Sequence, residues 1–210
     1  MVDQWLDSLK CFQQTVEALI KRPPKRSRVL LHVYELGGRG TALAAAISGL
    51  NIITLGAAGA FHAAIEIVNV SDGLEWSYGH VERGPGVYAI RARTHPNHKF
   101  KQTVELGETS VTRSELIRLT LAMQELWLGS AYQIVQCNCL TFCRAFTAAL
   151  GVGPVPQWVD RLSRVFAAPF NAAGSCRTER AMVRVGGQLS YVWGPTTGTL
   201  DGYRDVEMRV

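Results

Sequence analysis

Cysteine is scarce in this chain, and the few cysteines do not suit a secreted disulfide scaffold. The 210 residues include five cysteines, an odd number, and three of them are crowded between positions 137 and 143. Small secreted domains that depend on disulfides carry more cysteines, in pairs. The first residues also lack the basic start of a signal peptide, because acidic Asp3 and Asp7 lie there. These absences favour a reducing compartment, which we expect to be the cytoplasm and also the nucleus.

Charge of either sign is limited too. Charged residues make up 19% of the chain, and 22 Lys and Arg against 17 Asp and Glu leave a net charge of +5. Much of that excess lies in the basic stretch 21–28. No RNA-recognition signature, zinc-finger spacing or basic helix accompanies it, so nucleic acid is not expected as a partner. The hydrophobic content of 47% excludes wholesale disorder, and the length suits one substantial core.

The longest stretch without a charged residue does not resemble a transmembrane helix. Ala42 to Ile65 contains no Asp, Glu, Lys or Arg and is long enough to cross a bilayer. However, alanine and glycine dominate it, and it includes polar Ser48 and Asn51. Membrane-spanning helices depend on Leu, Ile, Phe and Val. No membrane span is therefore expected.

Motifs that hold cofactors or metal ions are also missing. The glycines at 37, 38 and 40 match neither dinucleotide nor P-loop spacing. Cys137, Cys139 and Cys143 form C-x-C-x3-C, whereas structural zinc sites usually pair two C-x2-C-like units. The chain has no H-E-x-x-H motif. Neither a cofactor nor a metal is expected.

Apolar periodicity predicts strands and helices in mixed order. The expected elements are a helix in residues 1–24, a strand at 29–34, a helix at 41–48, a hairpin of strands 61–70 and 74–78, a helix headed by the capping box at 112–115, and a helix at 139–150. Strands and helices without regular βαβ alternation indicate an α+β fold. No chemistry can be assigned to residues 171–210, which we treat as a C-terminal extension of unknown role.

The N-terminal helix carries one apolar stripe that must be buried somewhere. Trp5, Leu9, Phe12, Val16 and Leu19 recur at steps of four and three. Docking on the core of the same chain is the first expectation. Self-association, which would produce a homodimer, is the second.

Cys139 is the first candidate nucleophile. Asn138 is a good N-cap residue, so Cys139 would lie in the first turn of a helix. There the helix dipole and the first backbone N–H groups stabilise a thiolate and bind a developing oxyanion. The alternative is structural, because Cys139, Phe142, Cys143 and Phe146 also follow the spacing of a buried helical stripe.

A nucleophilic cysteine needs a base, and His62 is the best-placed histidine. It opens a predicted strand whose opposite face carries Phe61, Ala63 and Ile65, so its side chain points away from that apolar face. His32, His80, His95 and His98 compete with it. His95 and His98 lie in a polar loop, where we expect a surface role. The pattern by itself does not choose among them.

Several segments in one order resemble the PPPDE, or DeSI-like, family of isopeptidases. The resemblance extends from Val29 to about Phe170. The matching segments are Val33–Leu36, Phe61–Ile65, Glu75–Gly79, Gly84–Gly86, Leu106–Thr109, Tyr132, Asn138–Phe142 and Val155–Val159. Two positions depart from the family pattern: Phe61 stands where tryptophan is usual, and Leu140 replaces an asparagine after the cysteine.

The resemblance implies a peptidase domain over residues 25–170 with a circularly permuted papain-like fold. It implies Cys139 as the nucleophile and His62 as the base, acting without a cofactor on conjugates of ubiquitin-like proteins such as SUMO. Substrate contacts are expected at Tyr34, Trp76, Tyr78 and Asn138. No third catalytic residue is assigned.

Two further enzyme classes use the same pair of residues. Lecithin–retinol acyltransferase-like enzymes place a strand histidine before an Asn-Cys-x-x-Phe helix, but they usually read N-C-E-H-F where this chain has Leu140 and Thr141. A thioesterase acting on S-acylated proteins is the other. An inactive module that binds ubiquitin-like proteins is the alternative that is not an enzyme.

Overall fold

A computed structural model describes four parts of the chain, residues 25–36, 61–134, 136–159 and 178–195. Its strands are β1 (Ser27–Glu35), β2 (Phe61–Ile67), β3 (Leu74–Tyr78), β4 (Val87–Arg91), β5 (Lys99–Thr109), β6 (Thr178–Val185) and β7 (Gln188–Pro195). Its helices are α4 (Arg113–Leu126), a short 3-10 turn η1 (Gly129–Ala131) and α5 (Cys139–Leu150). The predicted α+β class is confirmed.

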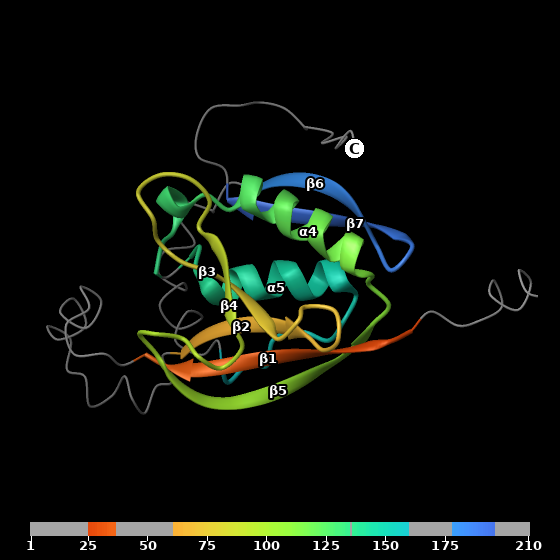
Figure 1. Cartoon of the computed structure of the whole chain (residues 1–210). Helices are drawn as coiled ribbons and strands as arrows, with labels where there is room; N and C mark the ends of the chain where they lie inside the picture. The colour runs from red at the N-terminus through yellow and green to blue at the C-terminus, as the bar shows by residue number, and fades with distance from the viewer. Residues whose placement is uncertain (1–24, 37–60, 135, 160–177, 196–210) are drawn as a thin grey trace, which may run out of the picture.

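Three layers make up the described fold (Figure 1). Strands β1 to β5 form one antiparallel sheet in the order β4-β3-β2-β1-β5, and β6 pairs with β7 in a separate hairpin. Helix α5 contacts β2 and β3 on one side and β7 on the other, while α4 packs against the hairpin. The core therefore lies around α5, between the sheet and the layer of α4, β6 and β7.

Both predicted caps are present, and they explain where the helices begin. At α4 the Thr112 side chain accepts from the Glu115 N–H, and the Glu115 carboxylate accepts from the Thr112 N–H. At α5 the Asn138 side chain accepts from two backbone N–H groups, and α5 ends at Gly151 in the left-handed conformation. Such caps stabilise a helix by about 1 kcal/mol each. The predicted bounds of α5 are confirmed.

The first hairpin is confirmed with one difference. Strand β3 has its predicted bounds, but β2 ends at Ile67 instead of Val70. The backbone N–H groups of Val70 and Ser71 turn back to the carbonyl of Ile67, and Asn69 has a φ of 64°. These bonds close a turn before the predicted end of the strand.

Four strands were not predicted. Strand β5 begins with a run of exposed residues, which hides the alternation of a half-buried strand. The hairpin β6–β7 falls in the segment treated as an extension, yet Ala181, Val183 and Val192 are buried in the common core. The Trp127 indole donates to the carbonyl of Trp193 at 2.8 Å. Residues 178–195 therefore pack as part of the same core.

Several expectations fall outside the described residues. They include the helix in residues 1–24, the helix at 41–48 and most of the uncharged stretch from 42 to 65. In the parts of the chain that the structure describes, neither α4 nor α5 is long and apolar enough to span a membrane.

Candidate active site

Cys139 is the first residue of α5, and its side chain reaches β2. It is 5% exposed. The backbone N–H groups of Ala63, Leu140 and Cys139 itself lie near enough to the sulfur to lower its pKa. Ala63 directly follows His62 on β2. The fold therefore brings the two residues predicted as nucleophile and base to the same end of β2.

The cap of α5 uses several of the N–H groups expected to bind an oxyanion. Asn138 Oδ1 accepts from the N–H groups of Leu140 and Thr141 at 3.0 Å each, and the Asn138 carbonyl accepts from the Phe142 N–H. Thr141 completes a capping box by accepting from the Asn138 N–H at 3.0 Å. The N–H of Cys139 is the first-turn donor outside this cap. The expectation that the whole first turn supplies oxyanion donors needs this correction.

The thiol is buried strongly enough to reverse the expected direction of its pKa. Burial raises the pKa of Cys139 to about 11, although the three backbone N–H groups beside the sulfur lower it. The expectation of a thiolate stabilised at a helix start is wrong for this resting structure. The N–H groups at the helix start lower the pKa of the thiol, but the loss of water around the sulfur raises it by more.

The raised pKa predicts slow alkylation of Cys139 by iodoacetamide. At pH 7 a thiol with a pKa of about 11 has roughly 300-fold less thiolate than free cysteine with a pKa of about 8.5. The rate should rise about tenfold per pH unit until the pH approaches 11. Peptide-level mass spectrometry would follow Cys139 separately, with the urea-unfolded chain as the control. A plateau near pH 6 would instead show an ion pair with a histidine.

His62 lies on the face of β2 that points away from α5, as predicted. Its Nε2 is 3.0 Å from Ser77 Oγ and 3.2 Å from the Tyr88 hydroxyl. Burial lowers the pKa of His62 well below its usual value, and His98 and His95 lower it further. His62 is therefore a neutral imidazole near pH 7, able to accept a proton.

Ser77 determines which nitrogen of His62 carries the proton. The Ser77 hydroxyl donates its single proton to the carbonyl of Ala63 at 2.7 Å. Its oxygen must then accept from His62, so Nε2 carries the hydrogen. Nδ1 is left with the lone pair, and it is the nitrogen that can act as a base.

His95 and His98 do not have the surface role expected of a polar loop. Their ring centroids each lie 4.7 Å from that of His62, and 4.3 Å from each other. Burial lowers the pKa of both rings, that of His95 to about 4. The loop between β4 and β5 therefore folds over His62, which its polar composition did not reveal.

The expected substrate contacts are mostly interior residues. Tyr34 and Tyr78 are fully buried: Tyr34 donates to Glu75 at 2.5 Å, and Tyr78 packs against Trp127. Half-buried Trp76 stacks on Phe146 in the core. A side chain that lines a substrate groove must be exposed. Tyr34 and Tyr78 are therefore interior packing residues, not the substrate contacts that we expected.

Asn138 also has a structural role, because it is buried and caps α5. Cys137 is disulfide-bonded, which differs from the expectation of reduced thiols. A disulfide sulfur has no thiolate to offer zinc, so Cys137, Cys139 and Cys143 do not form a zinc site.

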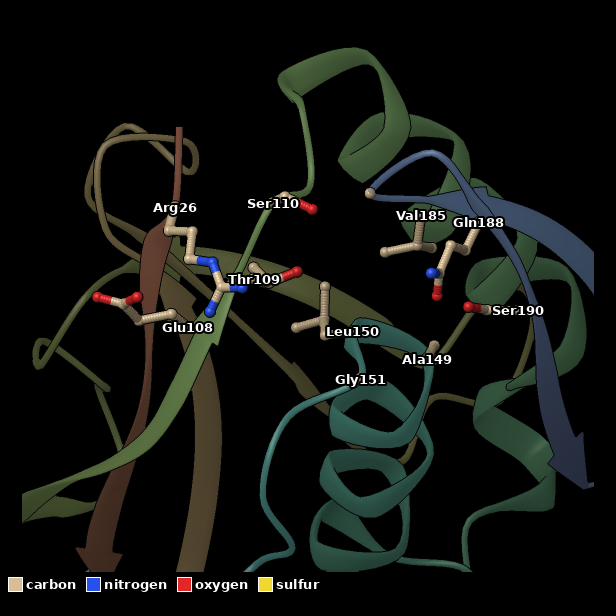
Figure 2. Close-up of a pocket in the computed structure, with 11 residues that line it drawn as sticks. Arg26, Glu108, Thr109, Ser110, Ala149, Leu150, Gly151, Val185, Gln188 and Ser190 are labelled. Atoms are coloured by element: carbon tan, nitrogen blue, oxygen red, sulfur yellow. The ribbon is translucent and has the colours of Figure 1, made fainter. Parts of the chain in front are cut away.

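One open pocket lies at the opposite end of α5 from Cys139 (Figure 2). Arg26, Ser110, Leu150 and Gln188 are among the residues that line its volume of about 320 Å³. Leu150 is roughly 16 Å from Cys139 along the helix, at about 1.5 Å per residue. The pocket is therefore distinct from the surroundings of Cys139 and His62.

The sequence analysis missed two neighbours of His62. The sequence pattern could have identified Ser77, because alternation along β3 places Glu75 and Ser77 on the face opposite the core-facing Trp76. Tyr88 lies on β4, which was not predicted. Its contact with His62 depends on the pairing of β3 with β4, for which the local sequence carries no signal.

Comparisons with known proteins identify the family of this chain. Residues 27–175 match the family model described as the PPPDE putative peptidase domain. A DeSI-like protein of Arabidopsis thaliana is 34% identical over 108 residues, which are 51% of this chain and 46% of that protein. A desumoylating isopeptidase 1 homolog of Caenorhabditis elegans is 28% identical over 112 residues, 51% of this chain and 32% of that protein. The matched part thus spans less than half of either relative, but the family model covers most of this chain, which therefore belongs to the PPPDE peptidase family.

Proposed function

We propose that this chain is a cysteine isopeptidase that removes ubiquitin or a ubiquitin-like modifier such as SUMO from lysine side chains. The observation that carries the proposal is the placement of Cys139. It lies at a capped helix start against the residue that follows His62. The neutral imidazole of His62, with its proton held on Nε2, supplies the base that a neutral thiol requires.

The reaction begins from a neutral thiol and a neutral imidazole. For proton transfer the His62 ring turns from the polar face of β2 toward the sulfur that lies against Ala63. Nδ1 then takes the thiol proton as Sγ attacks the carbonyl that joins the modifier to lysine. Collapse of the tetrahedral intermediate breaks the C–N bond, and His62 returns the proton to the leaving amine. Water, deprotonated by His62, then attacks the thioester, and the departing sulfur is reprotonated.

Charge that develops on the carbonyl oxygen needs a hydrogen-bond donor near Cys139. The N–H of Cys139 lies beside its sulfur, whereas those of Leu140 and Thr141 are bonded to the Asn138 cap. We assign the Cys139 N–H as the oxyanion donor from the first turn. Asn138 then acts by fixing the orientation of that turn.

The relatives support the substrate class. The protein from C. elegans carries a desumoylating isopeptidase name, which favours SUMO-like conjugates as the first substrates to test. In this chain the histidine strand precedes the cysteine helix, as expected for a circularly permuted papain-like fold. We extend the proposal to that permutation and to action in the cytoplasm and the nucleus.

A panel of defined substrates tests the proposed activity. Isopeptide-linked SUMO–lysine and ubiquitin–lysine peptides would be compared with an S-acylated peptide of the same sequence. Release of lysine peptide from at least one isopeptide substrate is expected. Cleavage of the thioester with no isopeptide cleavage would point to the thioesterase alternative. Absence of turnover on all three would favour the inactive binding module.

Replacing Ser77 with alanine should lower kcat about tenfold to a hundredfold, because Nε2 loses the acceptor that holds its proton. Tyr88 still contacts Nε2, which limits the loss. Ser77→Thr keeps the hydroxyl and should recover most of the activity. In a His62→Ala background, Ser77→Ala should have no further effect on kcat. An equal loss in both backgrounds would show that Ser77 has a merely structural role.

A further inference from the structure

We propose that His62, His95 and His98 form a binding site for a divalent transition-metal ion of the zinc type. The inhibitory consequence drawn below rests on the proposed function, but the binding site does not. Each histidine offers a ring nitrogen, and the three nitrogens lie within 4.8 Å of one another. Among the described residues, these three histidines form the group of His, Cys, Asp or Glu side chains whose ligand atoms lie this close together.

The three rings come from a rigid element and from a loop. His62 is held on β2, whereas His95 and His98 lie in the segment that connects β4 to β5. All three rings are in mutual contact, at centroid distances of 4.3 to 4.7 Å. Neither a carboxylate nor a thiol of the described residues belongs to the group, so its donors are imidazoles throughout.

The donor type fits zinc and related ions. Neutral imidazole is a preferred ligand for divalent zinc, copper, nickel and cobalt. Zinc takes nitrogen at about 2.0–2.1 Å in tetrahedral geometry, so the three nitrogens must come to roughly 3.3 Å from one another. His95 and His98 need to shift by about 1.5 Å toward His62. A connecting segment accommodates such a shift more readily than a central strand does.

A second observation also points to a ligand. Nδ1 of His98 is buried and has no hydrogen-bond partner. A buried polar atom without a partner is unfavourable, and a bound ion would satisfy it. The Tyr88 hydroxyl bridges Nε2 of His62 and Nε2 of His95, at 3.2 and 3.1 Å. Those two nitrogens therefore already converge on one polar position.

Metal binding would remove the base from the proposed reaction. A neutral imidazole has one lone pair and one N–H, and coordination uses the lone pair. Whichever nitrogen of His62 binds the ion, the other carries the proton and cannot accept one from Cys139. No proton is gained or lost overall, since each ring only moves its proton between its two nitrogens. The ion would act as a reversible inhibitor, not as a cofactor.

Direct binding of Zn²⁺ and Co²⁺ tests the site without any activity assay. The protein would be the full chain carrying Cys139→Ala, which removes the competing thiol. Calorimetry with Zn²⁺ should show one tight equivalent, and the Co²⁺ complex should give a tetrahedral spectrum without thiolate charge transfer. His95→Gln and His98→Gln should each weaken binding more than about 100-fold, beyond the effect of an outer-shell residue.

His80→Gln is the matched control, because His80 is exposed and outside the cluster. It should leave affinity unchanged, and circular dichroism would confirm that every variant is folded. Unchanged affinity in the folded His95→Gln/His98→Gln protein would overturn the site. The site would also be overturned if the Cys139→Ala protein, which keeps all three histidines, bound no equivalent of Zn²⁺.

Activity measurements address the inhibitory role separately. In protein with Cys139 intact, Zn²⁺ should inhibit and EDTA should restore turnover, while the turnover of His95→Gln/His98→Gln, compared with the metal-free rate of the same variant, should resist Zn²⁺. Equal inhibition of that variant would place the inhibitory ion on Cys139 and overturn this role. Tight binding in a protein without isopeptidase activity would retain the metal site and reject the proposed function.

Discussion

Cys139→Ala is expected to reduce isopeptide hydrolysis by a factor on the order of 10⁴ or more. The reason is chemical, because the variant has no sulfur to form the thioester, and loss of a nucleophile removes the whole covalent route. The fold should survive. The Asn138 cap and the core residues of α5 remain, and only a small buried volume is lost.

Cys143→Ala is the matched control for this substitution. Cys143 lies one turn further along α5 and is fully buried, so its replacement perturbs the same helix while the Cys139 sulfur stays in place. It should retain turnover at some loss of stability. Turnover of folded Cys139→Ala above about a hundredth of the wild-type rate would reject Cys139 as the nucleophile.

The second large effect is expected for His62→Ala. Loss of a general base should lower kcat by about 10²–10⁴-fold, and more here because the thiol pKa of about 11 leaves almost no thiolate at neutral pH. The residual rate should rise with pH as hydroxide replaces the missing base. Wild-type kcat should be nearly independent of pH between 7 and 8 by comparison, because His62 is already neutral there.

His32→Gln controls for the loss of a buried histidine. His32 is 1% exposed, lies on the neighbouring strand β1 and bonds to Glu66 at 2.7 Å. Its replacement should lower the midpoint of thermal unfolding while kcat changes little. A fall in kcat equal to that of His62→Ala would show that the polar face of the sheet acts as a structural unit, and His62 would lose its special role.

Local signals in the sequence were sufficient for the elements that hold the candidate site. Strand β3 and helix α5 have their predicted bounds, because a turn, a cap and a terminal glycine are all encoded within a few residues. The side of β2 occupied by His62 followed from simple alternation. These features need no knowledge of distant contacts.

Features that depend on distant contacts could not be predicted. The packing of His95 and His98 on His62 is created by the folding of the β4–β5 connection, and the local sequence reads only as polar. The pKa of Cys139 depends on how completely the sheet removes water from the sulfur. The helix start was recognisable, but the opposing effect of burial was not.

The hairpin β6–β7 illustrates the same limit for the fold. Leu189 and Tyr191 on β7 are exposed. On β6, the apolar residues that face the core alternate with positions that include arginine. The hairpin is held by packing against α4 and α5, and also by Glu115, which accepts from the Gly187 N–H at 3.0 Å. That bond joins residues 72 positions apart, and the sequence gives no indication of it.

Covalent capture by a modifier with an electrophilic C-terminus tests the central claim most directly. SUMO and ubiquitin ending in a propargyl amide would be incubated with the full chain, and the modified peptide would be mapped by mass spectrometry. We predict one adduct, on Cys139, with at least one of the two probes, formed much more slowly in His62→Ala and unaffected in Cys143→Ala. An adduct on another cysteine, or equal labelling of Cys139 with and without His62, would contradict the assignment of Cys139 and His62 as nucleophile and base.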